Sequence, residues 1–118
     1  MIDTAHFKEK EMACRCNECE TPEMSTELFA VLELVRLRFR EPVTITSGYR
    51  CPTHNMNVGG ARGSRHMKGD AADISVRNVT PKCVEQFLLD TFPNSYGIAA
   101  GKGFTHIDTR PVKARWKY

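Results

Sequence analysis

Hydrophobic residues recur at helical spacing in two parts of the chain. The first run predicts a helix from about Pro22 to Arg40, which Thr21 can cap and for which Pro22 suits the first position. Its apolar stripe, expected to face a sheet, consists of Met24, Leu28, Val31, Leu32, Val35 and Phe39. The second run predicts a helix from about Pro81 to Phe92, capped by Thr80, with a stripe of Val84, Phe87 and Leu88.

The strands are predicted from short segments of alternating or mostly apolar residues. They are Val43–Ser47, Ala72–Val76, Tyr96–Ala100 and Phe104–Asp108, and the pattern also allows a last strand over Ala114–Lys117. Residues 48–63 are rich in glycine, asparagine and proline, which predicts an irregular loop with one short helical turn. These elements predict an α+β fold, with a small, mainly antiparallel sheet packed against two main helices, and residues 1–118 are expected to form a single domain.

Composition and charge narrow the range of functions. Hydrophobic residues make up 41% and charged residues 26%, and no apolar run approaches the roughly 18 residues of a membrane span, so no membrane insertion is expected. The net charge of +3 is too small for a nucleic-acid footprint. The densest basic stretch, with Arg110, Lys113, Arg115 and Lys117, is predicted to be a solvated tail.

The stretch Ser64–Asp73 holds the most informative chemistry. His66 and Asp73 lie seven positions apart and would be separated by about 23 Å at most in an extended chain. A turn at Lys68-Gly69 would bring the imidazole back beside the carboxylate, and this nitrogen and oxygen pair suits zinc.

A third ligand is expected from His106. Alternation along Phe104–Asp108 places Phe104, His106 and Asp108 on one face of the strand. Two histidines and one aspartate leave a fourth position for water, the arrangement of catalytic zinc sites. If either histidine is considered alone, the simpler interpretation is an ordinary polar residue that binds no metal.

Three segments together resemble the M15 peptidases: Ser47-Gly48-Tyr49-Arg50, Ser64-x-His66-x-x-Gly69-x-Ala71-x-Asp73, and His106-Ile107-Asp108. Members of this family are zinc peptidases of D,D- and L,D-type that act on peptidoglycan peptides, and hedgehog-type domains share their fold. The resemblance covers about residues 6 to 118 and implies a hedgehog/DD-peptidase-like fold. It also implies that His66, Asp73 and His106 bind zinc.

The resemblance suggests roles for further residues. Arg50 would bind the substrate carbonyl or the developing oxyanion, although a structural arginine bonded to loop carbonyls is the simpler alternative. Ser64 would orient the substrate or the zinc-binding loop, or would only cap the loop. Many M15 enzymes carry an acidic general base three residues before the last histidine, where this chain has Gly103. Asp108 is therefore a candidate for the base, or for a group that orients His106.

Five cysteines and two aromatic residues near the C-terminus leave alternatives open. Cys14, Cys16, Cys19 and Cys51 are compatible with a second, structural zinc, with a disulfide or with free thiols. Cys83 is expected in the core. His54 is predicted to be a surface loop residue rather than part of a cleft, and for Trp116 and Tyr118 packing in the core or at an edge is favoured over lining a cleft.

The function predicted by these features is zinc-dependent hydrolysis of amide bonds in peptidoglycan peptides by a monomer that binds no nucleic acid. The alternative is an inactive zinc-containing domain of the same fold that binds the cell wall. The N-terminal stretch Met1–Lys8 has no basic region leading into an apolar one, so no signal peptide is expected. Synthesis in the cytoplasm and delivery to the wall by a phage or prophage lysis system would reconcile this with the substrate.

Overall fold

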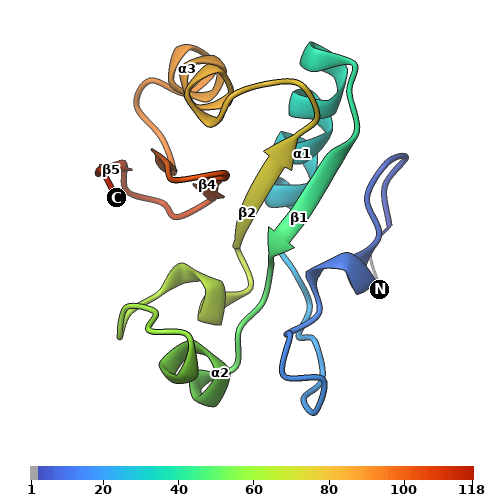
Figure 1. Ribbon diagram of the computed structural model, residues 1–118, viewed down its shortest axis with the longest axis vertical. Coiled ribbons are helices and arrows are strands. Elements are labelled where there is room, and N and C mark those ends of the chain that lie inside the picture. The colour runs from blue at the N-terminus through green and yellow to red at the C-terminus, as the bar shows by residue number, and fades with distance from the viewer. Residues whose placement is uncertain (1–2) are drawn as a thin grey trace.

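Five strands form one mixed sheet in the order β1-β2-β4-β3-β5 (Figure 1). Only the edge pair β3–β5 is parallel, so the expected α+β class with a mainly antiparallel sheet is confirmed. The strands are β1 Val43–Ser47, β2 Ala71–Val76, β3 Gly97–Ala100, β4 Thr105–Asp108 and β5 Ala114–Arg115.

This computed structural model describes residues 3–118, so the first two residues of the N-terminal stretch discussed above lie outside the described residues. Its α-helices are α1 Thr26–Phe39, α2 Pro52–Asn57 and α3 Pro81–Thr91. Two 3-10 helices, η1 Glu9–Met12 and η2 Arg65–Lys68, complete the elements. Within residues 3–118, no helix has the length and apolar character needed to cross a membrane.

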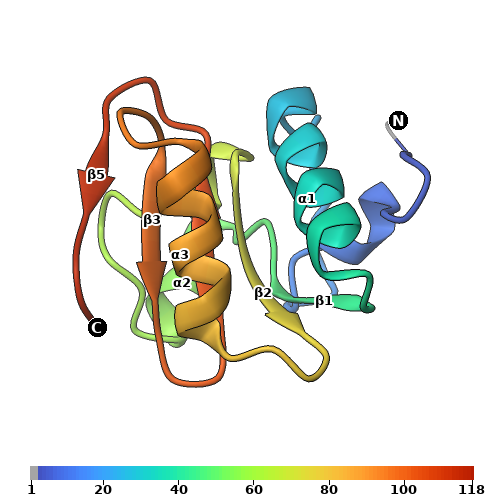
Figure 2. The same ribbon diagram turned by 90° about the horizontal axis from the view of Figure 1, so that it is seen from above.

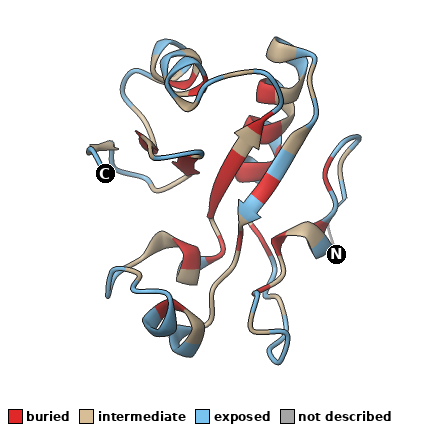
Figure 3. Cartoon of the chain, in the orientation of Figure 1, coloured by how far each residue is buried: buried red, intermediate tan, exposed pale blue. Residues whose placement is uncertain are grey.

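The two longer helices cover one face of the sheet. Helices α1 and α3 run alongside one another and contact both each other and β2 (Figure 2). Their buried side chains meet the alternate residues of the strands that point the same way, so that β2, β4 and the inner side of α1 are largely buried (Figure 3). The strand residues in this core include Ile45, Ala72, Ile74, Val76, Ile98 and Ile107.

Helix α1 begins four residues later than the predicted start at Pro22. Ser25, not Thr21, is the cap, and its Oγ accepts a hydrogen bond from the backbone N–H of Leu28. The backbone N–H of Ser25 donates to the carbonyl of Gly69 at 2.9 Å. This tertiary hydrogen bond delays the start of the helix, because the N–H of Ser25 cannot both pair with Gly69 and continue a helix from Pro22.

Helix α3 follows the prediction closely at its start. Thr80 caps it by accepting from the N–H of Cys83 at 3.2 Å, and Pro81 occupies the first turn. Val84 and Leu88 are buried as expected. Cys83 was predicted in the core but is exposed, because it lies one position before Val84 and points away from the buried face of the helix.

The segment between β1 and β2 carries α2 and η2 and extends beyond one end of the sheet (Figure 1). It is joined to the N-terminal segment, since the N–H of Tyr49 donates to the carbonyl of Met12 at 2.8 Å. Gly48 packs so tightly at this junction that an added Cβ would lie 2.6 Å from the Cα of Met12.

The prediction of a solvated basic tail is wrong for two of its four residues. Arg110 forms an ion pair with Asp108, and Arg115 donates hydrogen bonds to the carbonyls of Phe92, Ser95, Tyr96 and Ala114. A guanidinium carries five donors, which allows Arg115 to hold several loop carbonyls at once. Lys113 and Lys117 are exposed, as expected.

We expect Gly48→Ala to lower the free energy of unfolding by about 1–3 kcal/mol, because its methyl group would overlap backbone atoms of Met12 that cannot move alone. Gly63→Ala is the matched control, since nothing lies within 4 Å of its added Cβ. Urea unfolding of both variants would measure the difference. Equal midpoints for the two variants would contradict this account of the junction.

Candidate active site

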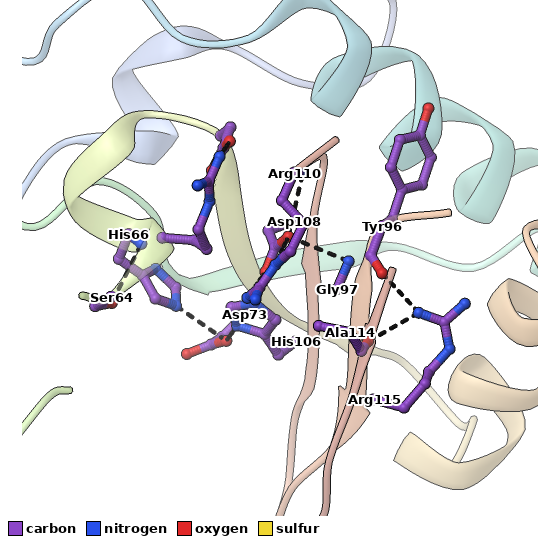
Figure 4. Close-up of polar contacts among 12 residues, drawn as sticks. Ser64, His66, Asp73, Tyr96, Gly97, His106, Asp108, Arg110, Ala114 and Arg115 are labelled. Carbon is purple, nitrogen blue, oxygen red and sulfur yellow. Dashed lines mark hydrogen bonds and ion pairs between the residues drawn. The ribbon is translucent and has the colours of Figure 1, made fainter. Parts of the chain in front are cut away.

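The three predicted metal ligands lie together although they come from three different elements. His66 is on η2, Asp73 on β2 and His106 on β4 (Figure 4). Their candidate donor atoms all lie within 4.8 Å of one another. Asp73 Oδ1 is 3.3 Å from His66 Nε2 and 3.0 Å from His106 Nδ1.

Strand pairing explains why two of the three candidate ligands, Asp73 and His106, lie side by side. Asp73 of β2 is directly opposite His106 of β4 in the antiparallel register, so both side chains point to the face not covered by α1 and α3. Gly69, with φ of 77°, makes the predicted turn after η2 and brings His66 to the same place. Asp108 also shares the face of His106, as the alternation predicted.

His66 is held in one orientation by the backbone. Its Nδ1 lies 2.7 Å from the carbonyl oxygen of Gly48, which can only accept, so Nδ1 carries the proton. The lone pair of Nε2 is then directed toward Asp73. Ser64 caps η2, because its Oγ accepts from the N–H of His66 at 3.2 Å. Ser64 also lines the cleft described below, so its position is compatible with both predicted roles.

His106 is oriented by a buried ion pair. Its Nε2 lies 2.7 Å from Oδ2 of Asp108, whose side chain is completely buried. Arg110 donates to Asp108 through Nε at 2.8 Å and Nη2 at 2.7 Å. The backbone N–H of Gly97 donates to the same carboxylate at 3.1 Å. With Nε2 donating to Asp108, Nδ1 is the nitrogen of His106 available to a metal beside Asp73.

The site therefore places two buried carboxylates, those of Asp73 and Asp108, beside the imidazole of His106. Burial opposes ionisation of Asp73, but the imidazoles of His106 and His66 beside its carboxylate outweigh burial and lower the pKa of Asp73 to about 2. Burial also opposes ionisation of Asp108, whose pKa is nevertheless held well below its usual value by Arg110 and His106. Burial would lower the pKa of His106, but its hydrogen bonds to Asp108 and Asp73 raise it. Both carboxylates are ionised at neutral pH, so a cation is favoured between them, either a proton on His106 or a metal.

The donor set fits zinc. Two imidazole nitrogens and one carboxylate oxygen are a known set for catalytic zinc, and each histidine has a hydrogen-bond partner on its other nitrogen. The Nε2 of His66, the Nδ1 of His106 and the carboxylate of Asp73 are the atoms that would bind it.

Arg50 lies at the edge of this cluster. Its Nη2 is 3.5 Å from Oδ2 of Asp73, while Nε donates to Ser47 Oγ at 3.1 Å and Nη1 to Asn55 Oδ1 at 3.3 Å. These contacts are to side chains, so the alternative of an arginine bonded to loop carbonyls is not what the structure shows for Arg50.

A cleft of about 520 Å³ opens over the three candidate ligands. Trp116 and Tyr118 line it, although packing in the core or at an edge was favoured for them. The ring of Trp116 contacts His106 edge-on, with centroids 5.0 Å apart. The chain after β5 therefore returns across the site, which the local pattern of those residues did not reveal. His54 is not among the described residues that line the cleft, as predicted, but it lies half-buried in helix α2 and not in a surface loop.

Two contributors to the site were not identified from the sequence. Arg110 holds Asp108, and Gly97 leaves room for that pair, because an added Cβ would lie 2.3 Å from Oδ2 of Asp108. The sequence could have revealed Arg110, because the alternation of Phe104, His106 and Asp108, continued by two residues, places Arg110 on the same face of the strand. Gly97 was not, because only its pairing with Asp108 across β3 and β4 gives it a role.

Among the described residues that line the cleft, no carboxylate takes the place of the acidic base that is usual at the position of Gly103. Gly103 lies in the exposed turn between β3 and β4 with φ of 81°. Among the described residues that line the cleft, Asp73 is the one carboxylate. Asp108 lies behind His106 and is shielded from the cleft.

Comparisons with known proteins concern the family of this chain. A family model described as Peptidase M15 matches residues 5–108. Zinc D-Ala-D-Ala carboxypeptidase from Streptomyces albus G is 56% identical over 34 residues, which cover 29% of this chain and 13% of that protein. Peptidoglycan L,D-endopeptidase MepK from Escherichia coli strain K12 is 30% identical over 79 residues, which cover 63% of this chain and 43% of MepK.

The chain spans less than half the length of these curated relatives. The family match, by contrast, extends over most of the 118 residues and includes all three candidate ligands. This chain belongs to the peptidase M15 family.

Proposed function

We propose that this protein is a zinc peptidase that hydrolyses amide bonds in peptidoglycan peptides. The observation that carries the proposal is the convergence of His66, Asp73 and His106 at the floor of a cleft, with donor atoms within 4.8 Å of one another. Family membership and the names of both relatives support the reaction class and the substrate class.

The chain supplies the ligands and zinc supplies the electrophile. Zinc held by His66, Asp73 and His106 would polarise a substrate carbonyl and would make water acidic enough to act near neutral pH. His66 and His106 are locked in rotation by Gly48 and Asp108, so their lone pairs are aimed before any ligand arrives. Such preorganisation avoids the cost of ordering the ligands at the moment of reaction.

Arg50 is the arginine best placed to stabilise the oxyanion. Arg65 and Arg110 also line the cleft, but each is paired closely with an aspartate, Asp70 and Asp108 respectively. Arg50 has only a 3.5 Å contact with Asp73 and is held by two neutral side chains. Its guanidinium can therefore turn its charge toward negative charge that develops on the substrate carbonyl.

Asp108 acts as a positioning residue in this proposal, the second of its two predicted roles. A general base must reach the proton that it removes, directly or through one water. The carboxylate of Asp108 is completely buried and bonded to His106, Arg110 and Gly97. These contacts fix the ring of His106 and leave Asp108 without access to the cleft.

A second function, zinc-dependent cell-wall binding without hydrolysis, is favoured by one observation. The described residues lining the cleft include no carboxylate other than the candidate ligand Asp73, and Gly103 stands where an acidic base is usual. The same ligands and the same cleft would then bind a peptide stem without cleaving it.

Digestion of purified peptidoglycan by the zinc-loaded protein should release defined peptides, identified by mass spectrometry, and a chelator should prevent the release. His66→Ala should abolish both zinc retention at this site and release, because it removes one of three ligands. His54→Ala should retain activity, since His54 does not line the cleft. Full activity of His66→Ala would contradict the assignment of the site, and zinc-dependent wall binding without release would establish the second function.

Asp108→Ala should weaken zinc binding by about 10- to 100-fold, because His106 loses the partner that orients it. Competition with a chromophoric chelator would measure the affinity, and turnover would be compared at saturating zinc. Unchanged affinity together with a fall in turnover of about 10²- to 10⁴-fold would assign Asp108 the role of general base instead.

Arg50→Lys should reduce kcat by about 10²- to 10³-fold with zinc content unchanged, because lysine keeps the charge but cannot reproduce the planar pair of donors. Arg62→Lys is the control, since Arg62 is exposed and is not among the described residues of the cleft. A rise in KM with kcat unaltered would indicate that Arg50 binds substrate and transition state equally.

A further inference from the structure

A second cluster of metal-binding side chains lies away from the cleft. Cys14, Cys16 and Cys19 come from the loop after η1, and Cys51 is the residue before α2. All four Sγ atoms lie within 4.8 Å of one another. Figure 1 shows this loop extending beyond the same end of the sheet as α2.

Three of the six sulfur–sulfur separations are close to those of a tetrahedral zinc site. A tetrahedral zinc site with zinc–sulfur bonds of about 2.3 Å places neighbouring sulfurs about 3.8 Å apart. Cys14 and Cys51 are separated by 3.8 Å, Cys16 and Cys51 by 3.9 Å, and Cys16 and Cys19 by 3.4 Å. A disulfide would require about 2.05 Å, and all four cysteines are free.

The backbone around the cluster supplies hydrogen bonds to sulfur. The N–H of Glu18 points to Cys16 Sγ, that of Cys51 to Cys14 Sγ and that of His54 to Cys51 Sγ, each at 3.4 Å. Donors directed at sulfur favour its anionic form, which is the form that binds metals. The loop after η1 and the start of α2 thus direct backbone N–H groups at the sulfurs of the cysteine cluster.

We propose that Cys14, Cys16, Cys19 and Cys51 bind a second, structural zinc ion. Four thiolates fill the tetrahedral shell and leave no open position for water, so this site stabilises the fold and does not take part in hydrolysis. The binding of zinc replaces protons on the thiols, which are released to solvent, and no oxidant is required.

The location of the cluster gives it a consequence for the active site. Cys51 follows Arg50 directly, and the strand end that includes Gly48 and Tyr49 is joined to Met12 by a hydrogen bond of 2.8 Å. Most residues of the loop between Cys14 and Met24 are exposed, so little apolar burial holds that loop in place. A metal cross-link there would anchor the segment that supplies both Arg50 and the carbonyl that orients His66.

Metal counting tests the proposal without any measurement of hydrolysis. Native mass spectrometry of zinc-loaded protein should show two zinc ions per chain in the unaltered protein and in Cys83→Ser, the control at an exposed cysteine outside the cluster. Cys14→Ser should bind one, and so should His66→Ala. One zinc in the unaltered protein and none in Cys14→Ser would support the cysteine site while counting against the histidine site. One zinc in both would overturn the proposal.

A second measurement does not depend on whether a cysteine variant folds. His66→Ala loaded with cobalt should show the intense sulfur-to-cobalt charge-transfer absorption of a tetrahedral thiolate site. In the zinc-loaded protein, a thiol reagent should modify only Cys83 rapidly, whereas chelation should expose all five thiols. Rapid reaction of all five thiols with zinc present, or an intact mass showing disulfides, would contradict the proposal.

Discussion

The antiparallel pairing of β2 with β4 is the constraint on which the candidate active site depends. It sets Asp73 opposite His106 on one face of the sheet and Ala72 opposite Ile107 on the other. A shift of one residue would exchange the two faces, placing the aspartate and histidine in the apolar core and exposing the core residues to the cleft. The burial of Ile74, Val76 and Ile107 beneath α1 and α3 therefore fixes the position of the site as well as the stability of the sheet.

The same constraint extends to the neighbouring strand. Pairing of β3 with β4 puts Gly97 beside Asp108, where the missing side chain leaves space for the buried ion pair with Arg110. That pair is stabilising only because the carboxylate of Asp108 is fully hydrogen-bonded. An unpaired buried charge would lower the free energy of unfolding by about 3–5 kcal/mol. Asp108 of this pair also contacts one ring nitrogen of His106, and the other ring nitrogen of His106 lies beside Asp73. Fold stability and ligand geometry thus depend on the same few contacts.

Local pattern was sufficient for most of the elements, and together with the resemblance to the M15 peptidases it named the candidate ligands. The alternation in Phe104–Asp108, the turn at Gly69 and the cap at Thr80 are decided by neighbours within a few residues, and the structure agrees with each prediction. The start of α1 and the exposure of Cys83 were not predicted correctly. The first depends on a hydrogen bond between Ser25 and Gly69, which are far apart in the sequence. The second depends on which side of α3 faces the sheet.

The sequence by itself determined the α+β class, the identity of His66, Asp73 and His106 as candidate ligands, and the resemblance to M15 peptidases, because spacing and residue type carry that information. Only the tertiary structure decided how these residues are used. It placed Asp108 behind His106, held it with Arg110, brought Trp116 and Tyr118 over the cleft and gathered four cysteines from two segments. Each of these results depends on segments that are distant in the chain and adjacent in space, and no local pattern records which distant segments meet.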